Sequence, residues 1–379
     1  MNHVNEPIRI AQIMGKMMSG GVESVVMNYY RHIDRTKVQF DFIIDDDSTI
    51  VPYDEIIGLG GRIHRVPPYQ NPIAYHEVLV ELFSQNQYHI VHSHINTMSI
   101  FPLFAAKRAG VPIRIAHSHS TAGKGETAKN IMKYVLRPFS KVFPTHFCAC
   151  SELAGRWLFG GKLYDSGRVN LIRNAIDISK FTFDVSIRDT MRDELGLEDN
   201  FVVGHVGRFM KQKNHSFLID IFDRVHNQKS NAILLLVGEG ELEQEVRDKV
   251  KKLGLTDCVR FLGVRNDVHR ILQAMDVFLL PSLYEGLGMV AVEAQAVGLP
   301  VIASDMVPME AKITEYLTYV SLGNSAEKWA EKVLTVQVNE RKTEAEIIVG
   351  AGYEIGSAAR DMLGYYQSFG RKKQNQTEG

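Results

Sequence analysis

The 379-residue sequence predicts an α/β fold with two doubly wound parallel-sheet domains. Short apolar runs that favour strands alternate with helical patterns over residues 8–150, and the same alternation restarts at residue 201. A chain of this length also exceeds what one hydrophobic core usually organises. Apolar residues make up 45% and charged residues 23% of the chain, which is typical of a globular protein.

The first series of strands opens the chain. Its strands are expected at residues 8–14, 40–45, 62–66, 89–94, 113–117 and 145–150. A glycine-containing loop and a helix from residue 22 to about residue 33 follow the first strand. Parallel strands need crossover connections, usually helices, and most segments between these strands have a helical pattern.

The second series repeats this architecture without repeating the residues. Its strands are expected at 201–207, 232–237, 259–262, 277–281 and 300–303, with helices at about 215–227, 241–253, 267–275 and 288–297. Residues 174–197 have mixed polarity and no sustained period, which indicates a linker. We therefore assign residues 1–184 to the first domain and 185–352 to the second. A helix at about 353–369 can pack back on the first domain.

The charge distribution limits the classes of partner. The formal net charge is −1, which argues against a dedicated nucleic-acid binder. Residues 107–180 nevertheless contain 13 basic and 4 acidic side chains, a basic belt that can face phosphates or an anionic membrane. No signal peptide and no run of the ~20 apolar residues that span a bilayer is apparent. We expect a cytoplasmic protein whose contact with the inner face of the cell membrane would be peripheral.

Two loops that follow the opening strands of the two series contain candidate anion-binding groups. Gly20 and Gly21 precede the first helix, where glycines permit close approach of a ligand and a helix N-terminus favours an anion. A simple tight turn explains them equally well, since neither a dinucleotide fingerprint nor a P-loop is present. Arg208 and Lys213 follow the strand at 201–207 and could neutralise a leaving diphosphate without a metal. Their alternative role is solvated surface.

The most informative segment follows the strand at 277–281. It contains Glu285, Gly286, Gly288 and Glu293, with a helix expected to begin near the second glycine. The glycines allow close backbone approach, and carboxylates are suited to accept hydrogen bonds from sugar hydroxyls. An acidic residue near a helix start can also serve only to stabilise the helix dipole.

Three other features have competing interpretations. His92, His94, His117 and His119 end two strands and could rim the first domain's crevice, although a strand-end histidine is more often structural. Asp45, Asp46 and Asp47 could form a metal-binding DxD motif, but we favour a solvated loop. Residues 127–143 form a basic amphipathic segment with Lys129, Lys133, Arg137 and Lys141, which suits either an anionic lipid surface or an ordinary solvated helix.

These motifs give the chain a resemblance that covers roughly residues 8–340. The sequence is similar to retaining glycosyltransferases of the GT-B fold, family four, and in particular to exopolysaccharide and capsule glycosyltransferases. Glu285 and Glu293 match the family's E-x7-E motif, and Arg208 and Lys213 match its diphosphate-gripping pair. The resemblance implies two Rossmann-like domains facing across a cleft, with the acceptor in the first and the nucleotide-sugar donor in the second.

The resemblance also implies roles for individual residues. Glu293 would hold the ribose hydroxyls, Glu285 would hold hydroxyls of the transferred sugar, and His117 would touch that sugar. The remaining donor-binding residues would be the loop glycines Gly20 and Gly21, the turn residue Glu239, Val264 and Arg265 near the base, and the backbone around Gly286, Leu287, Gly288, Met289 and Val290.

The motifs together with the resemblance therefore imply a retaining, metal-independent transferase that needs no cofactor. It would move a hexose or N-acetylhexosamine from a nucleotide-diphosphate sugar, expected to be a UDP-sugar, to a glycan or lipid-linked acceptor. A nucleotide-sugar epimerase and a non-catalytic nucleotide-sugar-binding protein are the alternatives, because fold alone does not fix function.

Overall fold

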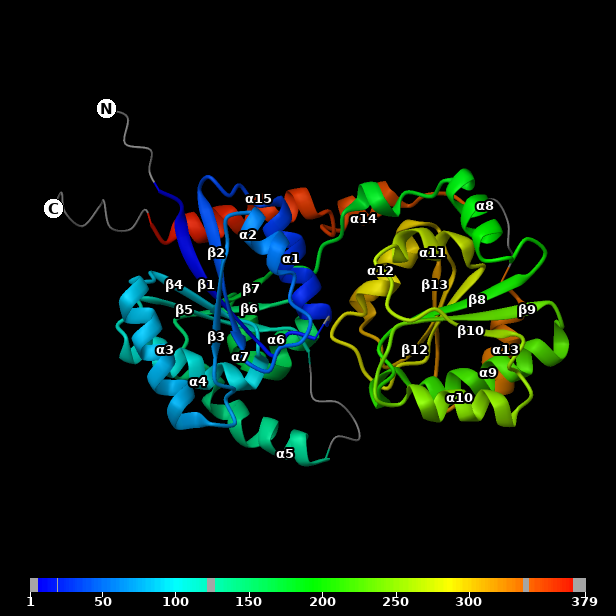
Figure 1. The fold of residues 1–379 in the computed structure, drawn as a ribbon, viewed down its shortest axis with the longest axis horizontal. Coiled ribbons are helices and arrows are strands. Elements are labelled where there is room, and N and C mark those ends of the chain that lie inside the picture. Colours follow the sequence, from blue (N-terminus) through cyan, green and yellow to red (C-terminus); the bar gives the residue numbers. More distant parts are fainter. Residues whose placement is uncertain (1–5, 19, 121–126, 337–340, 371–379) are drawn as a thin grey trace. The chain divides into compact units, whose positions relative to one another are not determined.

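The computed structural model confirms the predicted fold class and describes residues 6–18, 20–120, 127–336 and 341–370, with side chains omitted for 127–130. The chain divides into two compact units (Figure 1). The N-terminal unit joins the residues up to Ile176 to those from Gly352 onward, and the C-terminal unit is Asp177–Ala351. Residues 177–184, which the sequence analysis assigned to the first domain, thus lie in the second unit.

The N-terminal unit contains a seven-stranded, entirely parallel sheet in the order β3-β2-β1-β4-β5-β6-β7. Its strands are β1 (Ile8–Gly15), β2 (Val38–Asp45), β3 (Arg62–Val66), β4 (Ile90–Ser93), β5 (Ile113–Ser118), β6 (His146–Ala149) and β7 (Val169–Leu171). Its helices are α1 (Gly21–His32), α2 (Tyr53–Gly58), α3 (Pro72–Asn86), α4 (Ile100–Arg108), α5 (Thr127–Leu136), α6 (Glu152–Phe159), α7 (Gly161–Asp165) and α15 (Ile355–Ser368), with short 3-10 turns η1 (Asn96–Ser99) and η2 (Arg137–Lys141).

Side chains on β1 alternate between two layers of this unit. Ala11 and Ile13 belong to a core cluster that includes buried residues of α3, α4 and α6. Gln12 points to the opposite face, where it contacts Tyr366 of α15. Helix α15 packs against α1, so the last described helix completes a layer begun by the first (Figure 1). An isolated parallel β-bridge pairs Ile176 with Glu354, at the point where the chain returns to this unit.

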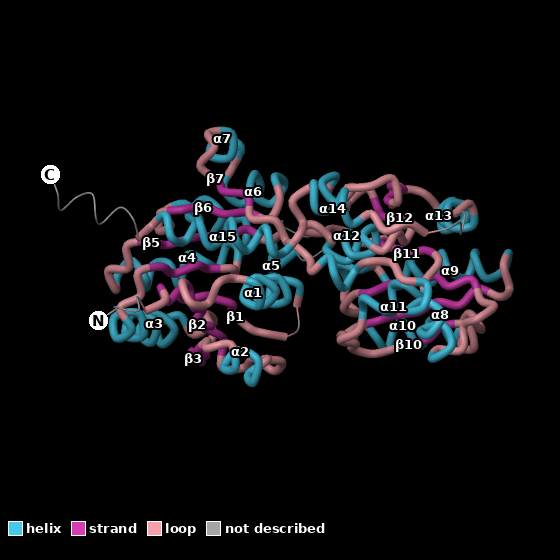
Figure 2. Tube along the Cα trace, turned by 90° about the horizontal axis from the view of Figure 1, so that it is seen from above, coloured by secondary structure: helices cyan, strands magenta, loops and turns pink. Residues whose placement is uncertain are grey.

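The C-terminal unit contains a six-stranded parallel sheet in the order β10-β9-β8-β11-β12-β13. Its strands are β8 (Phe201–Val206), β9 (Ala232–Val237), β10 (Val259–Phe261), β11 (Val277–Leu280), β12 (Val301–Ser304) and β13 (Leu317–Val320). Its helices are α8 (Val185–Glu194), α9 (His215–Gln228), α10 (Glu243–Lys252), α11 (Val268–Ala274), α12 (Met289–Ala296), α13 (Ala326–Leu334) and α14 (Ala345–Gly350), with 3-10 turns η3 (Ile178–Phe181), η4 (Lys211–Lys213) and η5 (Met309–Ala311) (Figure 2).

The segment expected to be a linker is more ordered than its sequence indicates. Residues 174–197 contain η3 and α8, and the Asp184 side chain caps α8 by accepting from the backbone N–H of Ser186. The Asp184 backbone N–H donates to Gln273, and Arg188 pairs with Asp276 in the same unit. These polar contacts explain why the segment lacks a strong apolar period yet packs on the second unit.

Candidate functional site

The predicted donor-binding loops of the C-terminal unit follow β8 and β11, which are neighbours in the sheet. The connection from β8 leads to β9 on one side, whereas β11 lies on the other side of β8, so the strand order reverses there. In open α/β sheets such a switch point opens a crevice at the carboxyl ends of the strands. Arg208, Lys213, Glu285 and Glu293 therefore come from the elements that border this crevice.

The carboxylate of Glu285 is the centre of a buried polar network. Glu285 is 6% exposed and accepts hydrogen bonds from Lys213 Nζ at 2.7 Å, Ser282 Oγ at 2.7 Å and Gln212 Nε2 at 3.2 Å. Gln212 also donates to the backbone oxygen of Tyr284. These contacts hold the loops after β8 and β11 together, and they identify Ser282 and Gln212 as site residues that the sequence analysis did not single out.

Lys213 and Glu285 are thus ion-paired with each other, whereas the resemblance assigned them to different parts of a ligand. The two assignments are chemically compatible, because a lysine ammonium has three donors and a carboxylate has about four acceptor positions. The pair leaves part of each group's capacity for a ligand. A buried pair of this kind also makes each partner costly to remove singly.

Glu293 lies in the first turns of α12, after the loop that contains Glu285. Burial raises the pKa of Glu293 to about 7, and the positive charge of Lys213 opposes part of that rise. Its carboxylate has no side-chain hydrogen bond to any described residue, in contrast to that of Glu285. A half-buried carboxyl group without a side-chain partner, in the helix that follows the Glu285 loop, is suited to receive ligand hydroxyls.

The loops around the crevice depend on glycine. Gly240 has φ +158°, and a Cβ at this position would lie 2.5 Å from the backbone oxygen of Phe209. Gly288 caps α12 with φ +81°, a left-handed conformation that favours glycine. Leu287 and Val290 are buried and Met289 begins the helix, so the backbone rather than these side chains is what this turn offers a ligand.

The other predicted donor-binding residues surround these loops. Arg208 is exposed and forms no ion pair within the described part of the chain. Glu239 is exposed, and its backbone oxygen accepts from Phe209. Val264 is 54% exposed, while Arg265 forms a bidentate pair with Asp267. The Arg265 guanidinium is therefore committed within its own loop.

In the N-terminal unit the predicted glycine loop begins α1. Gly20 is the residue that precedes the helix, and Gly21 is its first residue. A Cβ at Gly20 would meet the Glu23 carboxylate at 2.4 Å, whereas one at Gly21 would meet nothing within 4 Å. Glu23 accepts from the backbone N–H of Met18. The atoms near Gly20 are the flexible end of the Glu23 side chain, which can move, so packing requires glycine at neither position.

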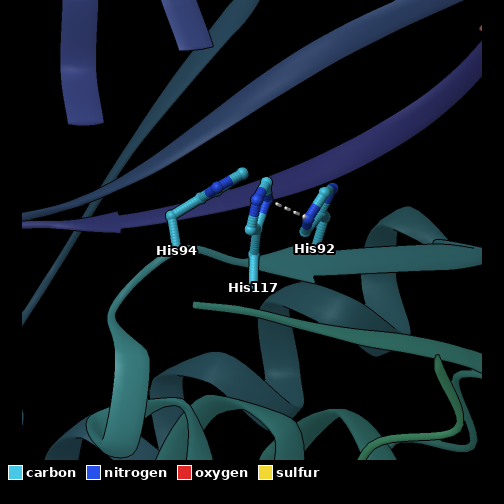
Figure 3. Close-up of side chains that lie close together, drawn as sticks. All are labelled: His92, His94 and His117. Atoms are coloured by element: carbon cyan, nitrogen blue, oxygen red, sulfur yellow. Dashed lines mark hydrogen bonds between the residues drawn. The ribbon is translucent and has the colours of Figure 1, made fainter. Parts of the chain in front are cut away.

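Four buried histidines lie at the carboxyl ends of β4 and β5. We call the histidine cluster the set His92, His94, His117 and His119. Strand register pairs His92 with Gln12 and with Ile115, so side chains two residues apart on these strands lie on one face. Figure 3 shows three of the rings side by side. The repeated triplet His-Ser-His in the sequence is the signal for this arrangement.

Hydrogen bonds divide the histidine cluster into two arms. In the first arm the Tyr366 hydroxyl lies 2.7 Å from His92 Nδ1, and His92 Nε2 lies 3.1 Å from His117 Nδ1. In the second arm Gln12 Oε1 lies 2.8 Å from His94 Nε2. The other nitrogen of the same ring, His94 Nδ1, lies 2.9 Å from His119 Nε2. Gln12 Nε2 donates to Tyr366 at 3.2 Å and joins the arms.

Burial favours the uncharged form of these rings. It lowers the pKa of His92 and of His119 to about 3, and it lowers those of His94 and His117 well below the ordinary value. Neighbouring rings add a smaller effect in the same direction for His117. A neutral imidazole at His117 cannot act as a cation toward a ligand, but it can donate or accept one hydrogen bond.

Potential metal ligands converge at one place in the described residues. Nitrogen atoms of His92, His94 and His117 lie within 4.8 Å of one another. Asp45, Asp46 and Asp47 do not form such a group; Asp45 is buried at the end of β2, and Asp47 pairs with Lys16 at 2.7 Å. Burial, together with the two adjacent aspartates, raises the pKa of Asp45 to about 6.

The basic segment after β5 exposes apolar side chains. Ile131, Val135 and Phe139 are 63%, 61% and 52% exposed. Lys133 and Arg137 are half-buried, and Lys141 is exposed; the side chain of Lys129 is outside the described residues. Within the part of the chain that the structure describes, we find no helix with the length and apolar character of a membrane span.

Comparison with known proteins identifies the family. Residues 19–180 match the family model described as Glycosyltransferase Family 4, and residues 187–351 match the model Glycosyl transferases group 1. The chain is 34% identical over 377 residues to EpsF of Bacillus subtilis (strain 168), which is named as a glycosyltransferase; the match covers 97% of this chain and 98% of EpsF.

Two further comparisons extend the likeness. The chain is 28% identical over 321 residues to the UDP-Gal:alpha-D-GlcNAc-diphosphoundecaprenol alpha-1,3-galactosyltransferase of Escherichia coli, with 81% of each chain covered. The crystal structure of Anabaena HepE in complex with UDP and glucose has a TM-score of 0.78 at 19% identity, covering 95% of this chain and 100% of HepE. The latter likeness shows the fold, and it agrees with the sequence resemblance to GT-B proteins. The chain belongs to the glycosyltransferases that combine a family 4 domain with a group 1 domain.

Proposed function

We propose that this glycosyltransferase moves a hexose or N-acetylhexosamine from a UDP-sugar to a glycan or lipid-linked acceptor during surface polysaccharide biosynthesis. Support for the donor comes from the UDP and glucose bound by HepE and from the UDP-Gal named for the Escherichia coli relative. Support for the pathway comes from relatives such as CapH of Staphylococcus aureus, which is named for capsular polysaccharide biosynthesis. We further propose that transfer retains the anomeric configuration and requires no metal.

The observation that carries this proposal is the presence of two carboxylates in different environments, Glu285 and Glu293, near the ammonium group of Lys213. Glu285 is fixed by Lys213, while Glu293 is half-buried and has no side-chain partner among the described residues. We assign Glu293 to the ribose hydroxyls, Glu285 to hydroxyls of the transferred sugar, and Arg208 with Lys213 to the diphosphate. The start of α12 would add backbone N–H donors and the positive end of the helix dipole for the same phosphates.

The proposed chemistry needs no protein nucleophile. The bond between the anomeric carbon and the diphosphate oxygen breaks, and the acceptor oxygen forms its bond on the same face of the sugar. The acceptor proton passes to the departing diphosphate, whose growing negative charge the two cations stabilise. We propose that His117 contacts the transferred sugar through a hydrogen bond and does not act as a base.

We also propose that α5 and η2 rest on an anionic membrane surface when the acceptor is lipid-linked. The exposed apolar residues of this segment would enter the interface, while its basic residues would contact lipid phosphates. The observation behind this proposal is the exposure of Ile131, Val135 and Phe139 on a chain segment with 13 basic and 4 acidic side chains over residues 107–180.

Incubating the purified chain with UDP-sugars and a lipid-linked sugar acceptor tests the proposed activity. We expect a UDP-sugar and UDP to raise the melting temperature, and we expect one UDP-sugar to give a glycosylated product with retained anomeric configuration. Interconversion of the donor sugar without transfer would favour an epimerase instead. Binding without turnover of any kind would favour a non-catalytic nucleotide-sugar-binding protein.

A further inference from the structure

In each arm of the histidine cluster, the donor and acceptor nitrogens of one ring determine which nitrogen of the next ring donates and which accepts. A neutral imidazole has one N–H donor and one lone-pair acceptor, so a ring that accepts at one nitrogen must donate at the other. The rings are buried, which favours their neutral form, and each arm uses both nitrogens of its inner histidine. The tautomer of the outermost ring is therefore set by the group at the opposite end of its arm.

The first arm can be followed from Gln12. When the amide nitrogen donates to Tyr366, the hydroxyl hydrogen is used within the network only if it is donated to Nδ1 of His92. His92 must then donate from Nε2 to Nδ1 of His117. The remaining nitrogen of His117, Nε2, consequently carries a hydrogen and is a donor.

The second arm starts from the other atom of the same amide. The Gln12 oxygen can only accept, so His94 donates to it from Nε2 and accepts at Nδ1. His119 supplies the hydrogen for that contact from Nε2, which leaves its Nδ1 as an acceptor. With this amide orientation all four rings have their hydrogen on Nε2.

Rotating the Gln12 amide by half a turn reverses every hydrogen bond. Its oxygen then accepts from Tyr366, whose hydroxyl accepts from His92, and its nitrogen donates to His94. All four rings now have their hydrogen on Nδ1. Amide orientation and histidine tautomer are assigned from hydrogen bonding, and these are the two states in which the Tyr366 hydroxyl donates its hydrogen within the network.

We propose that Gln12 and Tyr366 are positioning residues that hold all four rings of the histidine cluster in one common tautomer. The two terminal nitrogens, Nε2 of His117 and Nδ1 of His119, are buried and have no hydrogen-bond partner among the described residues. In either state one of them is a donor and the other an acceptor. Such a complementary pair matches a hydroxyl group, which both donates and accepts.

This inference bears on substrate recognition only through the proposed function, in which His117 contacts a sugar. Gln12 lies on β1 and Tyr366 on α15, 354 residues apart in the chain. The positioning residues are thus separate from the groups that would touch the ligand. Their contribution would be to fix the direction of the hydrogen bond at His117, and a wrong direction would weaken the contact with the transferred sugar in the transition state.

Nitrogen-15 NMR of the intact chain with labelled histidine tests the inference directly, because protonated and unprotonated ring nitrogens have distinct chemical shifts. We expect the four assigned cluster histidines to share one tautomer at neutral pH. Two different tautomers within the cluster of the wild-type chain would overturn the proposal, and this measurement requires no variant.

Tyr366→Phe removes the hydroxyl that joins the arms. We expect His92 and His117 to populate both tautomers in this variant, while His94 and His119 keep theirs. Tyr365→Phe is the matched control, because its hydroxyl contacts Cys148 instead, and it should change none of the four signals. A single unchanged tautomer at His117 in Tyr366→Phe would contradict the proposed positioning role.

Kinetics then separate this inference from the proposed function. In Tyr366→Phe we expect kcat to fall roughly three- to tenfold, the scale of one hydrogen bond, with little change in the KM for donor. Tyr365→Phe should retain wild-type kinetics. A common tautomer in a chain that transfers no sugar would refute the proposed function and leave the positioning role intact.

Discussion

Glu293 lies in the helix that follows the Glu285 loop, and its pKa is raised. In the free protein the ionised form of this side chain therefore lowers the free energy of unfolding. The folded-state pKa is about 7, against an ordinary value of 4.5. Stability associated with the protonated carboxyl is therefore fully present below pH 4.5 and is lost as the pH rises through 7. The ionised side chain is a cost to the empty site that a ligand with hydroxyl groups can offset.

Glu293→Gln should consequently stabilise the free protein in a pH-dependent manner. We expect the variant and the wild type to melt together near pH 4.5, and the variant to gain up to about 3 kcal/mol above pH 7. Calorimetry across this range provides the measurement. Glu346→Gln, an exposed position on α14, is the control. A stability difference that did not grow with pH would contradict the shifted pKa.

Glu293→Ala should weaken donor binding, because it removes the proposed ribose contact. A charge-assisted hydrogen bond contributes about 1.5–3 kcal/mol, which corresponds to a loss of at least tenfold in affinity. Isothermal titration with UDP checks this expectation, with Glu346→Ala as the control. Unchanged affinity in a folded variant would show that the carboxylate does not bind the nucleotide.

Arg208 and Lys213 should respond differently to removal of their charge. Arg208→Met should fold normally and lose turnover, since the exposed guanidinium has no ion-pair partner among the described residues. Lys213→Met should also destabilise the chain, because it strands the buried Glu285 carboxylate. Adding Glu285→Leu to Lys213→Met should restore stability without restoring transfer. Full activity of Arg208→Met, with Lys211→Met as control, would remove Arg208 from the diphosphate site.

At the scale of elements, α5 and η2 present both basic and apolar groups to solvent. We expect low-salt binding to anionic vesicles that weakens when Lys133, Arg137 and Lys141 are changed to Gln, because the electrostatic attraction is lost. Changing Ile131 and Val135 to Gln should remove the part of binding that survives high salt. Sedimentation with vesicles measures both effects.

The control for this experiment is Ile73→Gln on α3, an apolar position that is 71% exposed and lies outside the basic segment. It should leave vesicle binding unchanged. If the wild-type chain remains in the supernatant at low salt, α5 is an ordinary solvated helix and the acceptor is to be sought in solution.

The elements that the sequence predicts well are those with strong local patterns. The predicted strands 8–14 and 277–281 and the helix at about 353–369 match β1, β11 and α15. Strand β13, where only Leu317 and Val320 are buried, had too short an apolar pattern to be recognised. Helix α8 escaped notice because polar contacts such as Arg188 with Asp276 hold it in place.

In the candidate site, too, residues close together in the sequence could be predicted, whereas contacts between residues far apart in the sequence could not. Glu285 and Glu293 were recognisable because their spacing and glycines form one continuous motif. The contact between Gln12 and Tyr366 had no such signal, since it joins residues 354 positions apart and depends on how the units fold. Likewise, the pairing of Lys213 with Glu285 became visible only once β8 and β11 were neighbours.

At the scale of the whole molecule, the proposed mechanism assigns charge stabilisation to side chains and helix N-termini. We therefore expect transfer to proceed unchanged in excess EDTA. The assay compares rates with chelator alone and with added Mg²⁺ or Mn²⁺. Loss of activity that either ion restores would make Asp45, Asp46 and Asp47 the first residues to examine as metal ligands.

The closing helix of the N-terminal unit has a consequence for biosynthesis on the ribosome. Domains generally fold as units while the chain emerges. The C-terminal unit, Asp177–Ala351, is complete before α15 has been made, whereas the sheet that emerged first still lacks Tyr366 over Gln12 and His92. The nascent chain thus finishes its second unit before its first. A ribosome that stops early would release a protein without α15. The polar side chains that α15 covers would then lack their partners and be exposed, and cellular proteases could recognise this region.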